Sequence, residues 1–174
     1  MMNFALLFRN YGILLVTIGL FIVLALTADG FATERNLRNI LDQQSMVIIA
    51  AAFMTIAIIS GNFDVSVSAI FVTAPLFGLK VENMTGNVLL AVVAAIAVGL
   101  IMGAINGFIV TRLKINSFIG TLATSFMFFG AGFLISSRSL MRPESDAYRL
   151  IARSRFLGLT SATWIAIGVV IIAT

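Results

Sequence analysis

Apolar residues occur in blocks along this chain, and the charged residues gather between the blocks. An α-helix rises about 1.5 Å per residue, so roughly 20 apolar residues cross the hydrocarbon core of a bilayer. The pattern therefore predicts an all-α fold, a polytopic transmembrane helical bundle. About six membrane segments are expected, over residues 11–28, 46–60, 65–79, 88–110, 118–135 and 162–173.

The second and third segments differ from most of the others because each is short for a full crossing. Gly61-Asn62-Phe63-Asp64 separates them, and Pro75 lies inside the third segment, where proline is expected to kink a helix. Two arrangements stay open: two short spans, or a broken, re-entrant pair whose backbone is covered by protein or lines a wet cavity. Just before them, residues 33–44 are predicted to form a short interfacial helix capped by Thr33.

The two ends of the chain carry predictions of their own. Segment 11–28 is longer than the apolar part of a signal peptide and further spans follow it, so we expect a retained membrane anchor. The last segment is still apolar where the sequence stops, and about twelve residues are too few to span. We therefore expect 1–174 to be one transmembrane domain, the N-terminal part of a longer protein, with a polar extramembrane loop at 136–161.

Composition supports the membrane assignment and removes several chemistries. Apolar residues make up 60% of the chain and charged residues 10%, against roughly a quarter charged in soluble domains. With so little polar surface, the net charge of +4 indicates contact with anionic membrane lipid and not with nucleic acid. The chain has no Cys, no His and no phosphate-binding G-x-x-x-x-G-K-[ST] motif. We expect no catalytic residue, no metal site and no cofactor, so the chain is not expected to be an enzyme.

Small residues recur at every fourth position of the 88–110 segment. Residues at this spacing share one face of a helix, and small side chains there let a neighbouring helix approach to backbone contact. We therefore predict helix packing at Ala95, Gly99, Gly103 and Gly107.

Polar residues inside the apolar blocks are the candidates for a solute path. Asp64 has two interpretations: a path residue, or a cap that accepts from the N–H of Ser66 or Val67 and starts the next helix. The hydroxyls of 117–125 either line a polar path or bond to carbonyls of their own helix. The residues predicted near a translocation path are Asp64, Asn62, Asn106, Thr121 and Ser125.

Four stretches together resemble one family, the membrane permease subunits of bacterial ribose-type sugar ABC importers. Residues 31–41, FATERNLRNIL, look like the entry to its second span, and residues 54–68, MTIAIISGNFDVSVS, are similar to its S-G-G-I-D-L-S-V-G stretch. Gly103-Ala-Ile-Asn-Gly107 resembles its G-x-x-N-G. Residues 113–124, LKINSFIGTLAT, are similar to its K-I-x-x-F-I-x-T-L-A-T. The resemblance covers roughly residues 31–140, and Asn62 and Ser68 depart from it where the family has glycine.

The resemblance implies a permease subunit that moves a sugar or similar polar solute across the bacterial inner membrane. It also implies an ATPase subunit, a periplasmic solute-binding protein and a second permease subunit as partners. The family's cytoplasmic coupling segment, which docks on the ATPase, lies beyond the sixth span and has no match here. Two alternatives stay open: a secondary transporter that acts alone, and a truncated remnant without function.

The resemblance and the basic residues disagree about orientation. The family implies a cytoplasmic N-terminus and an external 136–161 segment, which could face the binding protein. That topology places three basic residues inside and eight outside, whereas the positive-inside rule prefers the reverse. We prefer the family's orientation because four motifs in the right order are more specific than the count.

Overall fold

The computed structural model describes residues 4–173, with the side chains of residues 8–148, 150 and 154–173. The chain divides into two compact units, Met1–Gln44 and Ser45–Thr174, and each is described by itself.

The first unit holds α1 (Phe4–Thr27) and the start of α2 (Glu34–Ile59). The backbone of Tyr11 leaves helical geometry (φ −126°), so the regular part of α1 that follows it corresponds to the predicted first segment. Thr33 Oγ1 accepts from the Asn36 N–H at 3.4 Å, which confirms the predicted cap.

The prediction of a short helix at 33–44 was wrong about its length. Helix α2 runs without a break for 26 residues, so the polar stretch and the following apolar stretch are one helix. The physical reason is local: residues 34–59 contain neither Gly nor Pro, so nothing interrupts the helical hydrogen bonds where the polarity changes.

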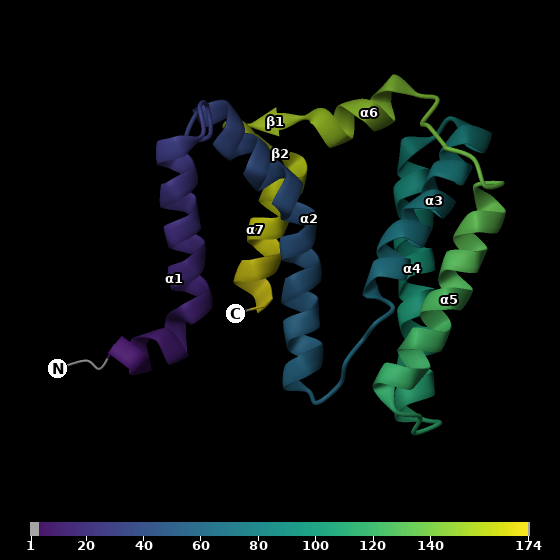
Figure 1. Cartoon of the computed structure of the whole chain (residues 1–174). Coiled ribbons are helices and arrows are strands. Elements are labelled where there is room, and N and C mark those ends of the chain that lie inside the picture. Colours follow the sequence, from purple (N-terminus) through teal and green to yellow (C-terminus); the bar gives the residue numbers. More distant parts are fainter. Residues whose placement is uncertain (1–3, 174) are drawn as a thin grey trace. The chain divides into compact units, whose positions relative to one another are not determined.

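The second unit continues from α2 into a coil and then into three helices. These are α3 (Val67–Thr85), α4 (Val88–Thr111) and α5 (Ser117–Ile135), which contact one another and lie side by side (Figure 1). Gly86 ends α3 in the left-handed region (φ 65°), which lets the chain reverse at once into α4. Asn116 caps α5 by accepting from the N–H groups of Phe118 and Ile119.

Helices α3, α4 and α5 share a small apolar core and two glycine contacts. The core consists of Ala69, Met102 and Phe128. A Cβ on Gly78 of α3 would lie 2.6 Å from the carbonyl oxygen of Ala91 in α4. A Cβ on Gly132 of α5 would lie 3.0 Å from Thr73 Oγ1 of α3. Helix α3 therefore packs against both neighbours at close to backbone distance, and it continues through Pro75 as one helix.

The polar segment after α5 contains regular structure. It includes α6 (Asp146–Arg153) and a short hairpin of β1 (Arg155–Phe156) and β2 (Leu159–Thr160), followed by α7 (Ser161–Ala173). Trp164 of α7 donates from Nε1 to the carbonyl oxygen of Phe156 at 2.9 Å, which fixes the hairpin to the next helix.

Helices dominate the described part of the chain, which confirms the all-α membrane fold. Four of the described helices are long and apolar enough to cross a bilayer: Phe8–Thr27, Glu34–Ile59, Val88–Thr111 and Ser117–Ile135. Helix α7 is apolar but has 13 residues, and α3 carries Lys80 and Glu82 near its C-terminal end. The expected count of about six spans is not confirmed.

Candidate functional site

The coil between α2 and α3 lies along the first turns of α5. The Phe63 N–H donates to Ser117 Oγ at 3.1 Å, and the Val65 N–H donates to Thr121 Oγ1 at 2.9 Å. From Ser117 to Thr121 the helix rises by about 6 Å, so the coil follows the first turn of α5. Backbone N–H groups within a membrane need a partner, and the hydroxyls of α5 supply it.

A chain of buried hydrogen bonds continues from this coil into the helix bundle. Asp64 Oδ1 accepts from the Ser66 N–H at 2.8 Å and from Ser66 Oγ at 2.7 Å. Ser66 Oγ accepts in turn from Asn106 Nδ2 at 2.5 Å, and Asn106 Oδ1 accepts from Thr124 Oγ1 at 2.6 Å. Ser66, Asn106 and Thr124 are all at least nine-tenths buried. The network joins the coil, α4 and α5 into one rigid corner at the start of α3.

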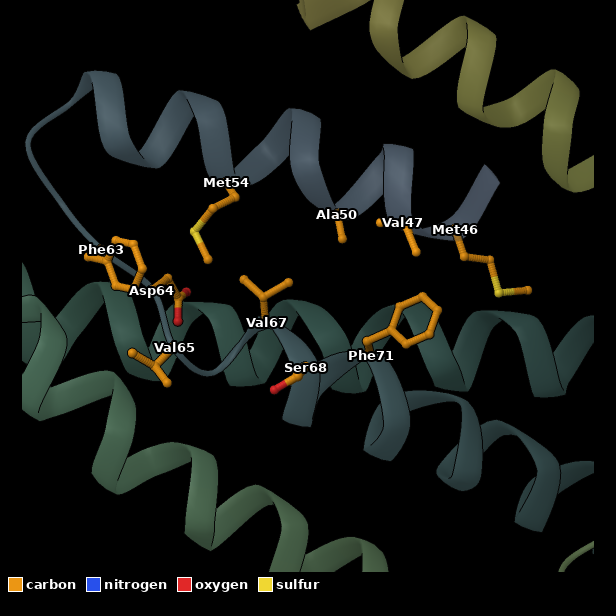
Figure 2. A pocket seen from close by; sticks show the side chains of 10 residues that line it. All are labelled: Met46, Val47, Ala50, Met54, Phe63, Asp64, Val65, Val67, Ser68 and Phe71. Atoms are coloured by element: carbon orange, nitrogen blue, oxygen red, sulfur yellow. The ribbon is translucent and has the colours of Figure 1, made fainter. Parts of the chain in front are cut away.

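Asp64 makes the hydrogen bond that its capping interpretation requires, because its carboxylate accepts from Ser66 immediately before α3. Its role on a solute path stays a prediction. The same side chain is half-buried and lines a cavity of about 430 Å³ between the later part of α2 and the start of α3. Figure 2 shows Met54 and Ala50 of α2 on one side of this cavity, with Val67 and Phe71 of α3 pointing toward them. Asp64 and Ser68 contribute polar groups to a wall that is otherwise apolar.

The structure separates the predicted path residues into different environments. Asn106, Thr121 and Ser125 are buried where α4 and α5 pack, and Thr121 Oγ1 also donates to the Ser117 carbonyl at 2.7 Å. Asn62 is exposed and donates from Nδ2 to the Ser60 carbonyl at 3.2 Å. Of the five, Asp64 is the residue that lines the cavity.

The predicted packing face of α4 is in contact only along its first half. A Cβ on Gly78 of α3 would meet Ala95 Cβ at 2.9 Å, and a Cβ on Gly99 would meet Ala74 Cβ at 3.8 Å. A Cβ on Gly103 or Gly107 would meet nothing within 4 Å in the described structure. Helix packing at these two glycines stays a prediction.

Two features of the bundle were not found from the sequence. Gly78 makes the closest approach, but it is a single glycine on α3 with no spacing pattern to mark it. Glu82 is completely buried, and it was not singled out from the sequence. Among the described residues, no group of His, Cys, Asp and Glu side chains is placed to hold a metal ion.

The comparisons with known proteins agree with this architecture. Residues 36–173 match the family described as "Branched-chain amino acid transport system / permease component". The chain belongs to this permease family. Its match to the permease family covers the coil, the cavity and all of α3 to α5.

Among its relatives in the permease family are two from Escherichia coli K12 with named sugars. The L-arabinose transport system permease protein AraH is 31% identical over 98% of this chain and 52% of its own length. The ribose import permease protein RbsC is 29% identical over 92% of this chain and 51% of its own length. The inner membrane ABC transporter permease protein YjfF, from the same strain, is 36% identical over 73% of this chain and 40% of its own length. The chain thus spans about half the length of the curated relatives it matches, and no solved structure matches it.

Proposed function

We propose that this chain is a membrane-spanning permease subunit, or part of one, of an ABC importer in the bacterial inner membrane. Its cargo is a sugar or a similar polar solute. The observation that supports this most strongly is the 31% identity to an arabinose permease over nearly the whole chain. The ribose permease among its relatives supports the same solute class.

The proposed partners follow from the proposed function. ATP hydrolysis takes place on a separate ATPase subunit, a periplasmic solute-binding protein delivers the solute, and a second permease subunit completes the path. We propose that Asp64 is the charged group of this chain closest to the solute, because its side chain lines the cavity. A carboxylate accepts hydrogen bonds strongly from hydroxyl groups, which sugars carry in number.

Uptake by reconstituted vesicles tests the function. The full-length subunit that carries this sequence is reconstituted with its ATPase in liposomes loaded with ATP, and labelled L-arabinose or D-ribose is added outside together with the binding protein. Uptake that needs internal ATP supports the importer. Uptake that instead follows an imposed proton or sodium gradient, with ADP inside, supports a secondary transporter and contradicts the proposal.

Asp64→Asn tests the residue separately from the fold. The amide keeps an oxygen that accepts from Ser66 but loses the charge, so α3 still starts correctly while the cavity changes. A lost hydrogen bond to a charged group is worth about 1.5–3 kcal/mol, so we expect uptake to fall about tenfold or more. Asp29→Asn, at an exposed turn of the first unit, is the control and is expected to leave uptake unchanged. Equal uptake by both variants would remove Asp64 from the path.

A further inference from the structure

Glu82 is a completely buried carboxylate that the proposed transport path does not use. It lies in the last turn of α3, far from Asp64 along that helix. Its Oε1 accepts from the Ser145 N–H at 2.8 Å, and its Oε2 accepts from the Glu144 N–H at 3.1 Å. The two oxygens therefore hold two successive backbone groups that lie more than 60 residues further along the chain.

These backbone groups stand directly before α6. Ser145 is the N-cap of α6, and its Oγ accepts from the Tyr148 N–H at 3.3 Å. A helix start carries partial positive charge and free N–H groups, so it stabilises a nearby carboxylate. A buried carboxylate without such donors costs several kcal/mol. The start of α6 thus explains why an acid is tolerated at this buried position.

The next residue of α3 strengthens the same contact. Asn83 Nδ2 donates to the carbonyl oxygen of Arg142 at 3.2 Å. Successive side chains of α3 therefore hold the backbone at Arg142, Glu144 and Ser145, in the stretch that leads from α5 to α6.

We propose that Glu82 is a positioning residue that clamps the start of α6 onto the end of α3. Because the other end of α3 starts at the Asp64 corner, a displacement of α6 moves α3, and a displacement of α3 moves α6. The consequence for transport rests on the proposed function, in which the 136–161 segment faces the solute-binding protein. Glu82 then fixes the position of α6 in the surface that the binding protein contacts.

Hydrogen exchange on the purified chain in lipid nanodiscs tests the clamp without any transport. Glu82→Gln keeps the side-chain volume but removes the charge and one of the two accepting oxygens. We expect the amides of Glu144 and Ser145 to exchange about tenfold faster or more, since a hydrogen bond to a charged group is lost. Glu144→Gln, the same substitution at an exposed acid of this segment, is the matched control. Exchange at wild-type rates in Glu82→Gln overturns the clamp.

If Glu82→Gln does not fold, a second variant tests the same contact by changing the donor Ser145 and leaving Glu82 intact. Ser145→Pro removes the N–H that donates to Glu82, and its backbone (φ −85°) already lies close to the range of proline. Ser145→Ala removes only the capping hydroxyl and serves as its control. Faster exchange at Glu144 in the proline variant, beyond that in the alanine variant, supports the clamp, and equal exchange overturns it.

Transport kinetics distinguish positioning from a loss of folded protein. In the reconstituted importer, Glu82→Gln is expected to raise the half-saturating concentration of the binding protein severalfold and to leave the maximal rate unchanged. A purely structural role lowers the maximal rate alone and contradicts this part of the proposal. If wild-type vesicles show no ATP-dependent uptake while the exchange result holds, the proposed function fails and the clamp stands.

Discussion

The two ends of α3 are held by the same kind of contact, a side chain bonded to backbone of another segment, but with different acceptors. At the coil end, the neutral hydroxyls of Ser117 and Thr121 accept from the backbone of residues 63 and 65. At the other end, the carboxylate of Glu82 accepts from the backbone of residues 144 and 145.

The difference shows where a membrane helix uses a charged hydrogen-bond acceptor and where neutral acceptors are enough. A neutral hydrogen bond contributes about 0.5–1.5 kcal/mol and one to a charged group about 1.5–3 kcal/mol. The coil is bonded to α5 through neutral hydroxyls, so no charge on α5 is needed there. The stretch before α6 is bonded to the Glu82 carboxylate, for which a helix start is a favourable partner, and to the Asn83 amide. The contact of the coil with α5 therefore uses neutral acceptors, and the contact of α3 with the start of α6 uses a charged one.

The largest expected effect comes from moving α3 as a whole, which breaks both ends at once. In Gly78→Ala the new Cβ lies 2.6 Å from the Ala91 carbonyl oxygen, so α3 and α4 must separate. Because the new Cβ meets backbone that cannot move aside cheaply, we expect a loss of about 3 kcal/mol or more of stability, measured by unfolding of the chain in mixed micelles with rising SDS. Gly103→Ala is the control, because its Cβ meets nothing within 4 Å and alanine favours the helix. Equal midpoints for the two variants would show that the close approach is absent.

A smaller effect is expected from Asn106→Ala, which breaks only the coil end. The change leaves the buried Ser66 and Thr124 hydroxyls without the amide that joins them, at a cost of about 1–3 kcal/mol. The same SDS titration measures it, with Asn62→Ala at an exposed position as the control. Exchange at Glu144 and Ser145 should stay at the wild-type rate, because the Glu82 end is intact. A faster exchange there would show that the Glu82 bonds also need the Asn106 network.

The smallest effect is expected from Thr121→Val, which removes one of the neutral hydroxyls that accept from the coil before α3. Loss of the bond from the Val65 N–H is worth about 1 kcal/mol, so exchange of that amide should rise several-fold. Thr111→Val is the matched control, since the Thr111 hydroxyl bonds to the Gly107 carbonyl of its own helix. An unchanged Val65 amide would mean that Thr121 does not hold the coil.

The sequence predicted the features that depend on neighbours in the chain. The bounds of α4 and α5 and the bond from Ser66 to Asp64 follow from local polarity and capping chemistry. The family resemblance was also visible in short motifs.

The features that were missed depend on distant partners or on helix rotation. Glu82 was not singled out because its partners are backbone groups more than 60 residues away. Positions four apart on a helix rotate by about 40° per step, given 3.6 residues per turn, so the four small residues of α4 do not all face α3. Gly103 and Gly107 therefore turn away from α3, while the helix keeps Met102 and Asn106 buried instead.

The reversal at Gly86 has a consequence for how the protein is made. It joins α3 to α4 through a two-residue link, so these helices find each other as neighbours as they leave the ribosome. The Phe63 N–H of the coil can bond to Ser117 only after the 54th residue beyond Phe63 has been synthesised. Glu82 must wait until residue 145 and is the last of these contacts to form. Nascent chains arrested between these points should therefore hold a paired α3 and α4 before either end of α3 is secured.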